Sequence, residues 1–407
     1  MNRRVLRYAV LLLGTLAYTC LTFVWFSLAA YLSAVTADLS LTATQAGLLT
    51  GAIPLTYIPL SLVSGSVVDR VGPYRAIGAG LAVFGAAQVG RAAAGSFAAI
   101  LGLTVVVGAG ATAVTFGLPK LVSELFPADA SGAPSSVYVL GASAGTAAAF
   151  SLGRGLLGPA AGGWRPLFRL TGFAVLGYAG FWLVVVRLVP LSRLRSADAA
   201  AAAANADDEV SLATLRRDIA RVFASGSMRL VVVAGVVYLL VVHGFQNWLA
   251  TVLEARGVRA SLAATATSGF VVAAAAGTLT LPVLSDRIDA RGTVIAACGA
   301  VCALGTAVLL VPGVPAVVGV AGALAAGVGA GGISPLVRVV PAELEAVGPA
   351  LTGTAVGLVF AVGETGGFLG PFLIGWLYDL SGSYAPGLAV ICACSLGAVV
   401  AGRRLPV

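Results

Sequence analysis

The chain has 407 residues, 59% of them hydrophobic and only 10% charged, with a formal net charge of +8 and a mean hydropathy of +1.01. A soluble core does not need this much apolar sequence, so the composition excludes an ordinary water-soluble protein and indicates a surface that faces lipid. The positive charge is then a signal of membrane orientation and not evidence for nucleic-acid binding.

Apolar windows that could cross a bilayer recur along the whole chain. A spanning helix needs about 20 apolar residues, and on this criterion the sequence predicts an all-α membrane protein. We expect twelve transmembrane helices, over residues 8–33, 45–67, 76–94, 97–118, 136–160, 167–189, 229–251, 262–284, 293–311, 316–337, 352–376 and 385–402.

The basic residues predict the orientation of these helices. Cytoplasmic loops of membrane proteins are enriched in Lys and Arg, and most of the 24 basic residues fall on one side if the N-terminus is cytoplasmic. The exceptions on the outer side are Arg91, Arg165, Arg169, Arg256 and Arg259. We therefore expect a multi-pass protein of the cytoplasmic (plasma) membrane with both termini in the cytoplasm.

A short charged phrase occurs twice, after the second and after the eighth predicted helix. The first copy contains Gly65, Asp69, Arg70, Gly72 and Arg75, and the second contains Asp286, Arg287 and Arg291. The copies lie about half a chain apart, which predicts a duplicated, pseudo-symmetric protein. We expect a six-helix bundle over 1–190, a central cytoplasmic linker over 191–228 and a second six-helix bundle over 229–407.

The repeated phrase predicts a gate at the cytoplasmic ends of both bundles. Its aspartates can accept hydrogen bonds from a helix N-terminus and its arginines can pair with carboxylates, so such contacts can hold one conformation closed. Charges that merely set topology are the alternative.

In the linker, a helical pattern from Ser211 to Phe223 has an apolar stripe and three arginines, which fits a helix on the membrane surface or a solvated connector.

Four motifs together resemble a known family. They are Gly65-x-x-x-Asp69-Arg70-x-Gly72-x-x-Arg75, its looser counterpart at Asp286, the turn Gly163-Trp164-Arg165-Pro-Leu-Phe168, and Gly366-Gly367-Phe-Leu-Gly370-Pro371 followed by Gly375-x-x-x-Asp379. At these positions they resemble the major facilitator superfamily of secondary transporters. The resemblance implies a carrier that works by alternating access, and no enzymatic activity.

Two departures from the family pattern are visible. Many members carry an arginine in the fourth helix where this chain has Thr104, four residues before Gly108. This puts in doubt a proton relay built on that arginine. The Gly158-Pro159 pair lies close to Trp164, near the end of the fifth predicted helix, whereas drug/proton antiporters resemble one another in a Gly-Pro segment deep in that helix. This disfavours an exporter.

Ionisable and polar residues at membrane depth are the candidate site, because burying them in lipid is costly. His243, the only histidine, shares one face of its helix with Gln246 and Asn247. In the first helix, Tyr18, Thr22 and Trp25 also share a face. We expect both faces and Arg154 to line a central cavity that binds substrate; packing against neighbouring helices is the alternative for Tyr18 and Trp25.

Proton coupling is expected at Glu364, near the middle of the eleventh helix, together with His243. A carboxyl group in a low-dielectric medium and an imidazole are the groups that exchange protons most readily near neutral pH. The alternative for Glu364 is a hydrogen-bonded packing residue.

Arg154 and the scarcity of carboxylates at membrane depth favour a small organic or inorganic anion as substrate. The segment from His243 to Leu249 is similar to cyanate and nitrate permease-like branches of the family, but the predicted second and eighth helices lack the arginines of nitrate porters, so nitrate is not assigned. Proton-driven efflux of an amphipathic compound and a non-transporting membrane sensor remain alternatives.

The sequence predicts no cofactor and no metal site. The five cysteines, Cys20, Cys298, Cys302, Cys392 and Cys394, all lie in predicted helices, where they are expected to pack as small apolar residues. The expected partners are a small-molecule substrate, protons and the lipid bilayer, with no nucleic acid. We expect the protein to function as a monomer.

Overall fold

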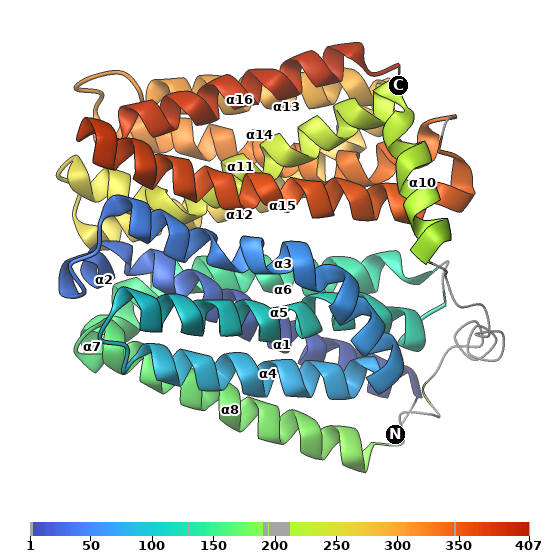
Figure 1. Ribbon diagram of the computed structural model, residues 1–407, viewed down its shortest axis with the longest axis horizontal. Helices are drawn as coiled ribbons and strands as arrows, with labels where there is room; N and C mark the ends of the chain where they lie inside the picture. The colour runs from blue at the N-terminus through green and yellow to red at the C-terminus, as the bar shows by residue number, and fades with distance from the viewer. Residues whose placement is uncertain (1–2, 128–129, 190–193, 195–211, 346, 407) are drawn as a thin grey trace. The chain divides into compact units, whose positions relative to one another are not determined.

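The computed structural model describes residues 3–127, 130–189, 194, 212–345 and 347–406, and within them the regular elements are helices (Figure 1). The expected all-α class is therefore confirmed. By their contacts, the residues form two units: unit 1 is Met1–Tyr31 with Pro59–Glu209, and unit 2 is Leu32–Ile58 with Val210–Val407. The expected division at 190 and 229 stays a prediction; it differs from these units in the placement of residues 32–58.

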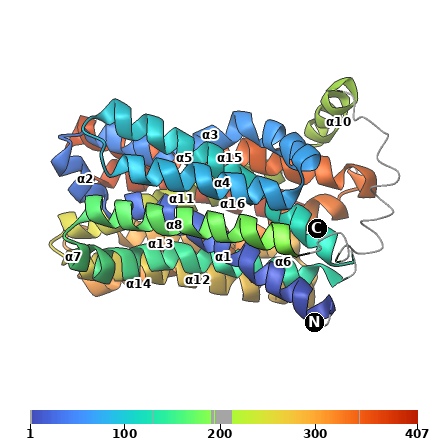
Figure 2. The ribbon, with the colours of Figure 1, turned by 90° about the horizontal axis from the view of Figure 1, so that it is seen from below.

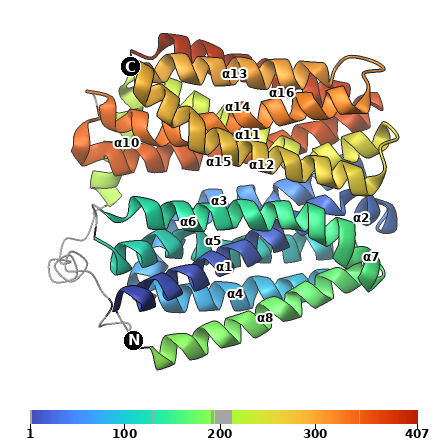
Figure 3. The same cartoon turned by 180° about the vertical axis from the view of Figure 1, so that it is seen from behind.

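Unit 1 is built around two groups of packed helices. Helix α4 lies between α5 and α8, and α1 lies along α6 (Figures 1 and 3). A Cβ added to Gly80 would lie 2.6 Å from the carbonyl oxygen of Gly110, so α4 and α5 can pack this closely only because both residues are glycine. The helices are α1 (Arg3–Ala30), α3 (Ala43–Val71, from Pro59 on), α4 (Pro73–Arg91), α5 (Phe97–Leu125), α6 (Gly132–Ala148), η2 (Ala149–Leu157), α7 (Gly158–Ala161) and α8 (Trp164–Leu188).

Two elements of this unit are irregular. Helix α3 bends by 66° between Ser61 and Val63. The expected fifth span runs without a break from α6 into α7, but its middle part, η2, is a π-helix. A π-helix widens the hydrogen-bonded turn to five residues and often occurs at functional sites.

Unit 2 is organised around α11, which packs against α14, α15, α16 and α12. The first half of α3 belongs to this unit and contacts α15: a Cβ added to Gly47 would lie 2.7 Å from the carbonyl oxygen of Pro371. The helices are α2 (Leu32–Asp38), α3 up to Ile58, α10 (Leu212–Ala224), α11 (Gly226–Ala255), α12 (Ala260–Ile288), α13 (Arg291–Val308), α14 (Ala316–Glu343), α15 (Gly348–Ser381) and α16 (Ala385–Arg404).

Helix α10 confirms the helix expected in the linker, and it packs against α15 and α11 (Figure 2). Its Arg216, Arg217 and Arg221 are exposed. Its position on a membrane surface stays a prediction, and the linker residues 195–211 lie outside the described part of the chain.

Among the described residues, ten helices are long and apolar enough to cross a membrane, and eleven if the bent helix α3 counts as one span. The expected third span corresponds to α4, which does not meet this criterion because it carries Arg75, Gln88 and Arg91 within 19 residues. The number twelve therefore stays a prediction, while the multi-pass architecture is evident from the other helices.

Candidate functional site

The polar face expected on α11 is present in unit 2. His243, Gln246 and Asn247 are all buried, and the side-chain amide of Asn247 donates a hydrogen bond to the backbone oxygen of His243 at 2.7 Å. This bond is made within the helix and fixes the orientation of the Asn247 amide on the backbone of α11.

Glu364 on α15 approaches His243 on α11. A Cβ built on Gly367 would lie 3.0 Å from Oε2 of Glu364, 3.2 Å from Cδ2 of His243 and 3.3 Å from Cβ of Pro54. The carboxyl group and the imidazole therefore converge on one point, and the absence of a side chain at Gly367 leaves room for both. Oε2 of Glu364 is shielded from solvent and has no hydrogen-bond partner among the described residues.

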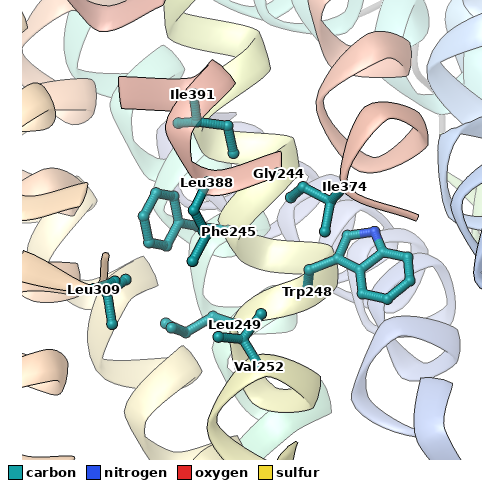
Figure 4. A pocket seen from close by; sticks show the side chains of 9 residues that line it. All are labelled: Gly244, Phe245, Trp248, Leu249, Val252, Leu309, Ile374, Leu388 and Ile391. Carbon is teal, nitrogen blue, oxygen red and sulfur yellow. The ribbon is translucent and has the colours of Figure 1, made fainter. Parts of the chain in front are cut away.

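Apolar packing occupies a neighbouring face of α11. Gly244, Phe245, Trp248, Leu249 and Val252 border a small cavity of about 10 Å³ that is closed by Leu309, Ile374, Leu388 and Ile391 (Figure 4). This is room for about one water molecule. The indole nitrogen of Trp248 donates to the backbone oxygen of Pro371 at 2.9 Å, which ties α11 to α15 close to Gly367.

In unit 1, the three candidates on α1 differ in their surroundings. The Tyr18 ring lies 6.1 Å from the Tyr138 ring of α6, measured between centroids, and is partly exposed. Thr22 is buried and its hydroxyl donates to the backbone oxygen of Ala142 at 2.9 Å, so it serves the contact between α1 and α6. Trp25 is buried and stacks on Phe26. Their role in substrate binding stays a prediction.

Arg154 lies in the π-helix η2 and faces the end of α1. Its guanidinium carbon lies 4.5 Å from the centre of the Tyr31 ring, and the Tyr31 hydroxyl donates to the backbone oxygen of Gly153 at 3.3 Å. A Cβ on Gly158 would overlap the Tyr31 hydroxyl, so glycine is required there. The cation is partly exposed and lies within the range of a cation–π contact with the ring.

The first charged phrase borders an open hollow of about 360 Å³ between α3 and α5. Asp69 pairs there with Lys120, whose amine lies 2.8 Å from its carboxylate. Gly72 has φ of +85° where the chain turns from α3 into α4, a conformation that favours glycine. Gly65 also lines the hollow, and Arg70 and Arg75 are exposed. The sequence does not identify Lys120 as the partner of Asp69, although it is the chain's single lysine.

The second charged phrase forms a different cluster in unit 2. Arg291 contacts Asp286 and also pairs with Glu343 of α14, with Nη2 and Oε1 separated by 3.0 Å. Nε of Arg291 donates to the same carboxylate at 3.1 Å. Arg287 is exposed. The arginine thus bridges α12, α13 and α14 at one end of the unit, and the acidic partner Glu343 was not identified from the sequence.

Two further groups have contacts that the sequence does not predict. Arg91, counted above among the charges on the outer side, is the last residue of α4 and is completely buried, with its guanidinium enclosed by α1 and α5. Its side of the membrane stays a prediction. Asp379, at the end of α15, accepts hydrogen bonds from the backbone nitrogens of Ala43 and Thr44 at 3.0 and 2.7 Å. It therefore caps the N-terminus of α3.

The sequence is similar to known proteins along most of its length. A family profile described as Major Facilitator Superfamily matches residues 14–371. Among curated proteins, the 3-(3-hydroxy-phenyl)propionate transporter of Escherichia coli (strain K12) is 28% identical over 365 residues, which cover 88% of this chain and 83% of that protein.

Solved structures share the fold. A bacterial homolog of the human lysosomal transporter Spinster matches with a TM-score of 0.75 and 18% identity, covering 98% of this chain and 94% of that one. A D-xylose-proton symporter matches with a TM-score of 0.76 and 15% identity, covering 98% and 97%. The nucleoside transporter NupG matches with a TM-score of 0.76 and 12% identity, covering 98% and 100%.

Proposed function

This chain belongs to the major facilitator superfamily, and from that premise we propose that it is a proton-coupled importer of a small organic anion. Its relatives are transporters, and it is itself a multi-pass secondary transporter rather than an enzyme. The proposal concerns the coupling ion, the class of substrate and the direction of transport. It also includes the cytoplasmic membrane as location, cytoplasmic termini and a monomeric carrier.

The observation that carries the proposal is the convergence of Glu364 and His243 on Gly367. Ionising Glu364, whose Oε2 has no hydrogen-bond partner among the described residues, is costly inside a membrane protein. The protonated and ionised forms of Glu364 therefore need different surroundings, and a change of protonation favours a change of conformation. This is the property that a proton-coupling residue requires. A related fold with a proton-coupled activity is the D-xylose-proton symporter.

The charges of unit 1 support an anion as substrate. Arg154 presents a guanidinium on the Tyr31 ring, and the described acidic residues of this unit, Asp69 and Glu124, lie near the ends of α3 and α5 where Lys120 is found. The relative from Escherichia coli is named for an aromatic carboxylate. A carboxylate of similar size is the substrate class we propose, with Arg154 as the residue that binds it.

The gate remains part of the proposal. Asp69 and Lys120 form an exposed ion pair in unit 1, whereas Asp286, Arg291 and Glu343 form a less exposed cluster in unit 2. An exposed pair such as the first adds little to stability, about 0–1 kcal/mol. It can therefore be broken and remade during a transport cycle at low cost, as a latch requires.

The test is uptake into proteoliposomes with and without an imposed proton gradient, using 3-(3-hydroxyphenyl)propionate as the first probe. We expect the wild type to accumulate the probe only with the gradient. Glu364→Gln should reduce gradient-driven accumulation of the probe about tenfold or more. Exchange of labelled for unlabelled probe across the membrane should continue, because exchange needs no net proton movement.

The matched control is Glu345→Gln, which changes an exposed carboxylate after α14. It should accumulate the probe like the wild type. Gradient-driven accumulation that is unchanged in Glu364→Gln would remove the coupling assignment. If the wild type does not respond to a proton gradient at all, proton coupling itself is wrong.

A further inference from the structure

Arg91 is a completely buried cation inside unit 1 that the proposed transport site does not use. Its Nε donates to the Thr104 hydroxyl of α5 at 3.1 Å, and its Nη1 donates to the backbone oxygen of Val24 in α1 at 3.4 Å and to Oε1 of Gln88 at 3.2 Å. All three acceptors are neutral, so none of them is a counter-ion for the guanidinium.

The surrounding dipoles are oriented toward this charge. The amide nitrogen of Gln88 donates to the Ser27 hydroxyl at 3.1 Å and to the Thr171 hydroxyl at 3.4 Å, which leaves its oxygen for Arg91. Helices α1, α4, α5 and α8 thus all contribute to one network. Arginine has five donor hydrogens, yet Nη2 of Arg91 has no hydrogen-bond partner among the described residues.

No described carboxylate of unit 1 lies near Arg91. The two acidic residues, Asp69 and Glu124, lie near the C-terminal ends of α3 and α5, whereas Arg91 ends α4 and contacts Thr104, close to the start of α5. The other charged side chains described in the half of the unit that contains Arg91, namely Arg154, Arg165 and Arg169, are also basic.

We propose that Arg91 is a selectivity residue: its fixed charge makes the interior of unit 1 favour anionic over neutral solutes. The inference rests on the proposed anion transport and extends it to a residue outside the binding site. If residue 91 served only to hold the four helices together, an apolar or amide side chain could do so without the free-energy cost of burying an ion. The charge acts through a medium whose effective dielectric constant is below that of water, so at a given distance it is felt more strongly than a charge in solvent.

The position of the guanidinium also bears on the threonine at position 104. Thr104 stands where many members of the family have arginine, and Arg91 donates to its hydroxyl. In this chain the cation at that point of α5 is supplied by α4. A side chain at 104 can consequently neutralise Arg91 without removing it, and this makes a sharp test possible.

The experiment compares matched carboxylates and amides on the purified full-length chain. Affinities for 3-(3-hydroxyphenyl)propionate, shorter and longer aryl carboxylates, and the amide of each are measured by thermal shift and by competition. We expect the wild type to prefer carboxylates. Arg91→Gln should reduce the carboxylate-to-amide affinity ratio about tenfold, because one unit charge is lost from the interior.

A second pair of variants removes the ambiguity of a folding defect. Thr104→Glu places a carboxylate against Arg91 and should lower the ratio as Arg91→Gln does, whereas Thr104→Gln, of equal size, should leave it close to the wild-type value. Arg169→Gln changes an exposed arginine at the start of α8 and is expected to have no effect.

The outcomes are distinct. A ratio that is unchanged in Arg91→Gln, or equal in Thr104→Glu and Thr104→Gln, while the wild type prefers carboxylates, overturns the selectivity role and leaves the anion function in place. A wild type that binds amides as well as carboxylates, or binds no member of the series, contradicts the anion function and this inference together.

Discussion

The position of Asp379 can be explained only by its contact with the N-terminus of helix α3. Asp379 lies in the last turn of α15, where the helix dipole disfavours a negative charge. The N-terminus of α3 offsets this, because Ala43 and Thr44 donate their backbone nitrogens and Thr44 adds its hydroxyl at 2.6 Å. Burial, with nearby acidic groups, raises the pKa of the adjacent Tyr384 to about 12, so its phenol stays neutral beside this carboxylate.

We predict that Asp379→Asn destabilises the protein by about 1 kcal/mol, because an amide has one acceptor oxygen where the two carboxylate oxygens accept from Ala43 and Thr44. The measurement is the midpoint of thermal unfolding in detergent. Asp289→Asn is the control: Asp289 is an exposed carboxylate at the end of α12, in a left-handed conformation that asparagine also adopts readily. Equal midpoints for the two variants would contradict the capping role.

At the residue scale, the sequence predicts the unusual groups better than their partners. Glu364 and His243 are visible because each interrupts a long apolar helix, and the structure brings them together on Gly367. Arg91 is not visible, because an arginine at the end of an apolar segment has the same pattern whether it enters a loop or turns inward. Its burial depends on Thr104 and Gln88, which are tertiary contacts.

The π-helix η2 is the element that sets the position of Arg154. The turn between α6 and α7 is widened over nine residues, and the Tyr31 hydroxyl reaches the backbone oxygen of Gly153 within it. Gly158, which follows the π-helix directly, gives the Tyr31 ring the space it needs. The aromatic ring under Arg154 thus depends on one glycine in the next element.

We predict opposite effects of two glycine-to-alanine changes along this element. Gly158→Ala should displace Tyr31, lower the thermal midpoint and weaken binding of the anionic probe, because the new Cβ overlaps the hydroxyl. Gly155→Ala meets no atom within 4 Å and should leave the midpoint unchanged or raise stability by up to about 1 kcal/mol, as alanine does in helices. Weaker binding in Gly155→Ala than in Gly158→Ala would contradict this account.

Helices are the part of the fold that hydropathy predicts well, because lipid allows only internally hydrogen-bonded backbone. The segments expected around 229–251 and 262–284 correspond to α11 and α12, each extended by a few residues. Irregularities within helices are not predictable in this way. The π-helix and the 66° bend of α3 do not alter the apolar composition of their segments, so hydropathy averaged over a window of residues does not reveal them.

On the scale of the whole molecule, the repeated phrase predicts equivalent positions but not equivalent contacts. In unit 1 the aspartate pairs with a lysine of α5, while in unit 2 it shares an arginine with Glu343 of α14. Arg291 donates three hydrogen bonds to that carboxylate, from Nε and Nη2, and such multidentate pairs are stronger than a single lysine contact. The duplicated phrase thus supplies two proposed latches of unequal strength, and the pattern identifies their aspartates but not the partners Lys120 and Glu343.

The predicted orientation has a direct test. If the chain crosses the bilayer twelve times with a cytoplasmic N-terminus, the loops after α3 and α12 lie on the same, cytoplasmic side. In a variant without native cysteines, Val71→Cys and Ile288→Cys, both at exposed positions at the ends of α3 and α12, should react with an impermeant thiol reagent only from that side. Labelling of the two from opposite sides would contradict the twelve-helix topology and the pseudo-symmetry of the gate.

Lys120 has a practical consequence because it is the chain's single lysine and is about half exposed. An amine-reactive fluorophore used above neutral pH will attach to one ε-amino group, at the rim of the hollow beside Asp69. The unaltered protein therefore contains a single lysine labelling site at the proposed inner gate. The rate at which Lys120 reacts with the fluorophore, compared with and without solute, would report opening of this gate without any engineered residue.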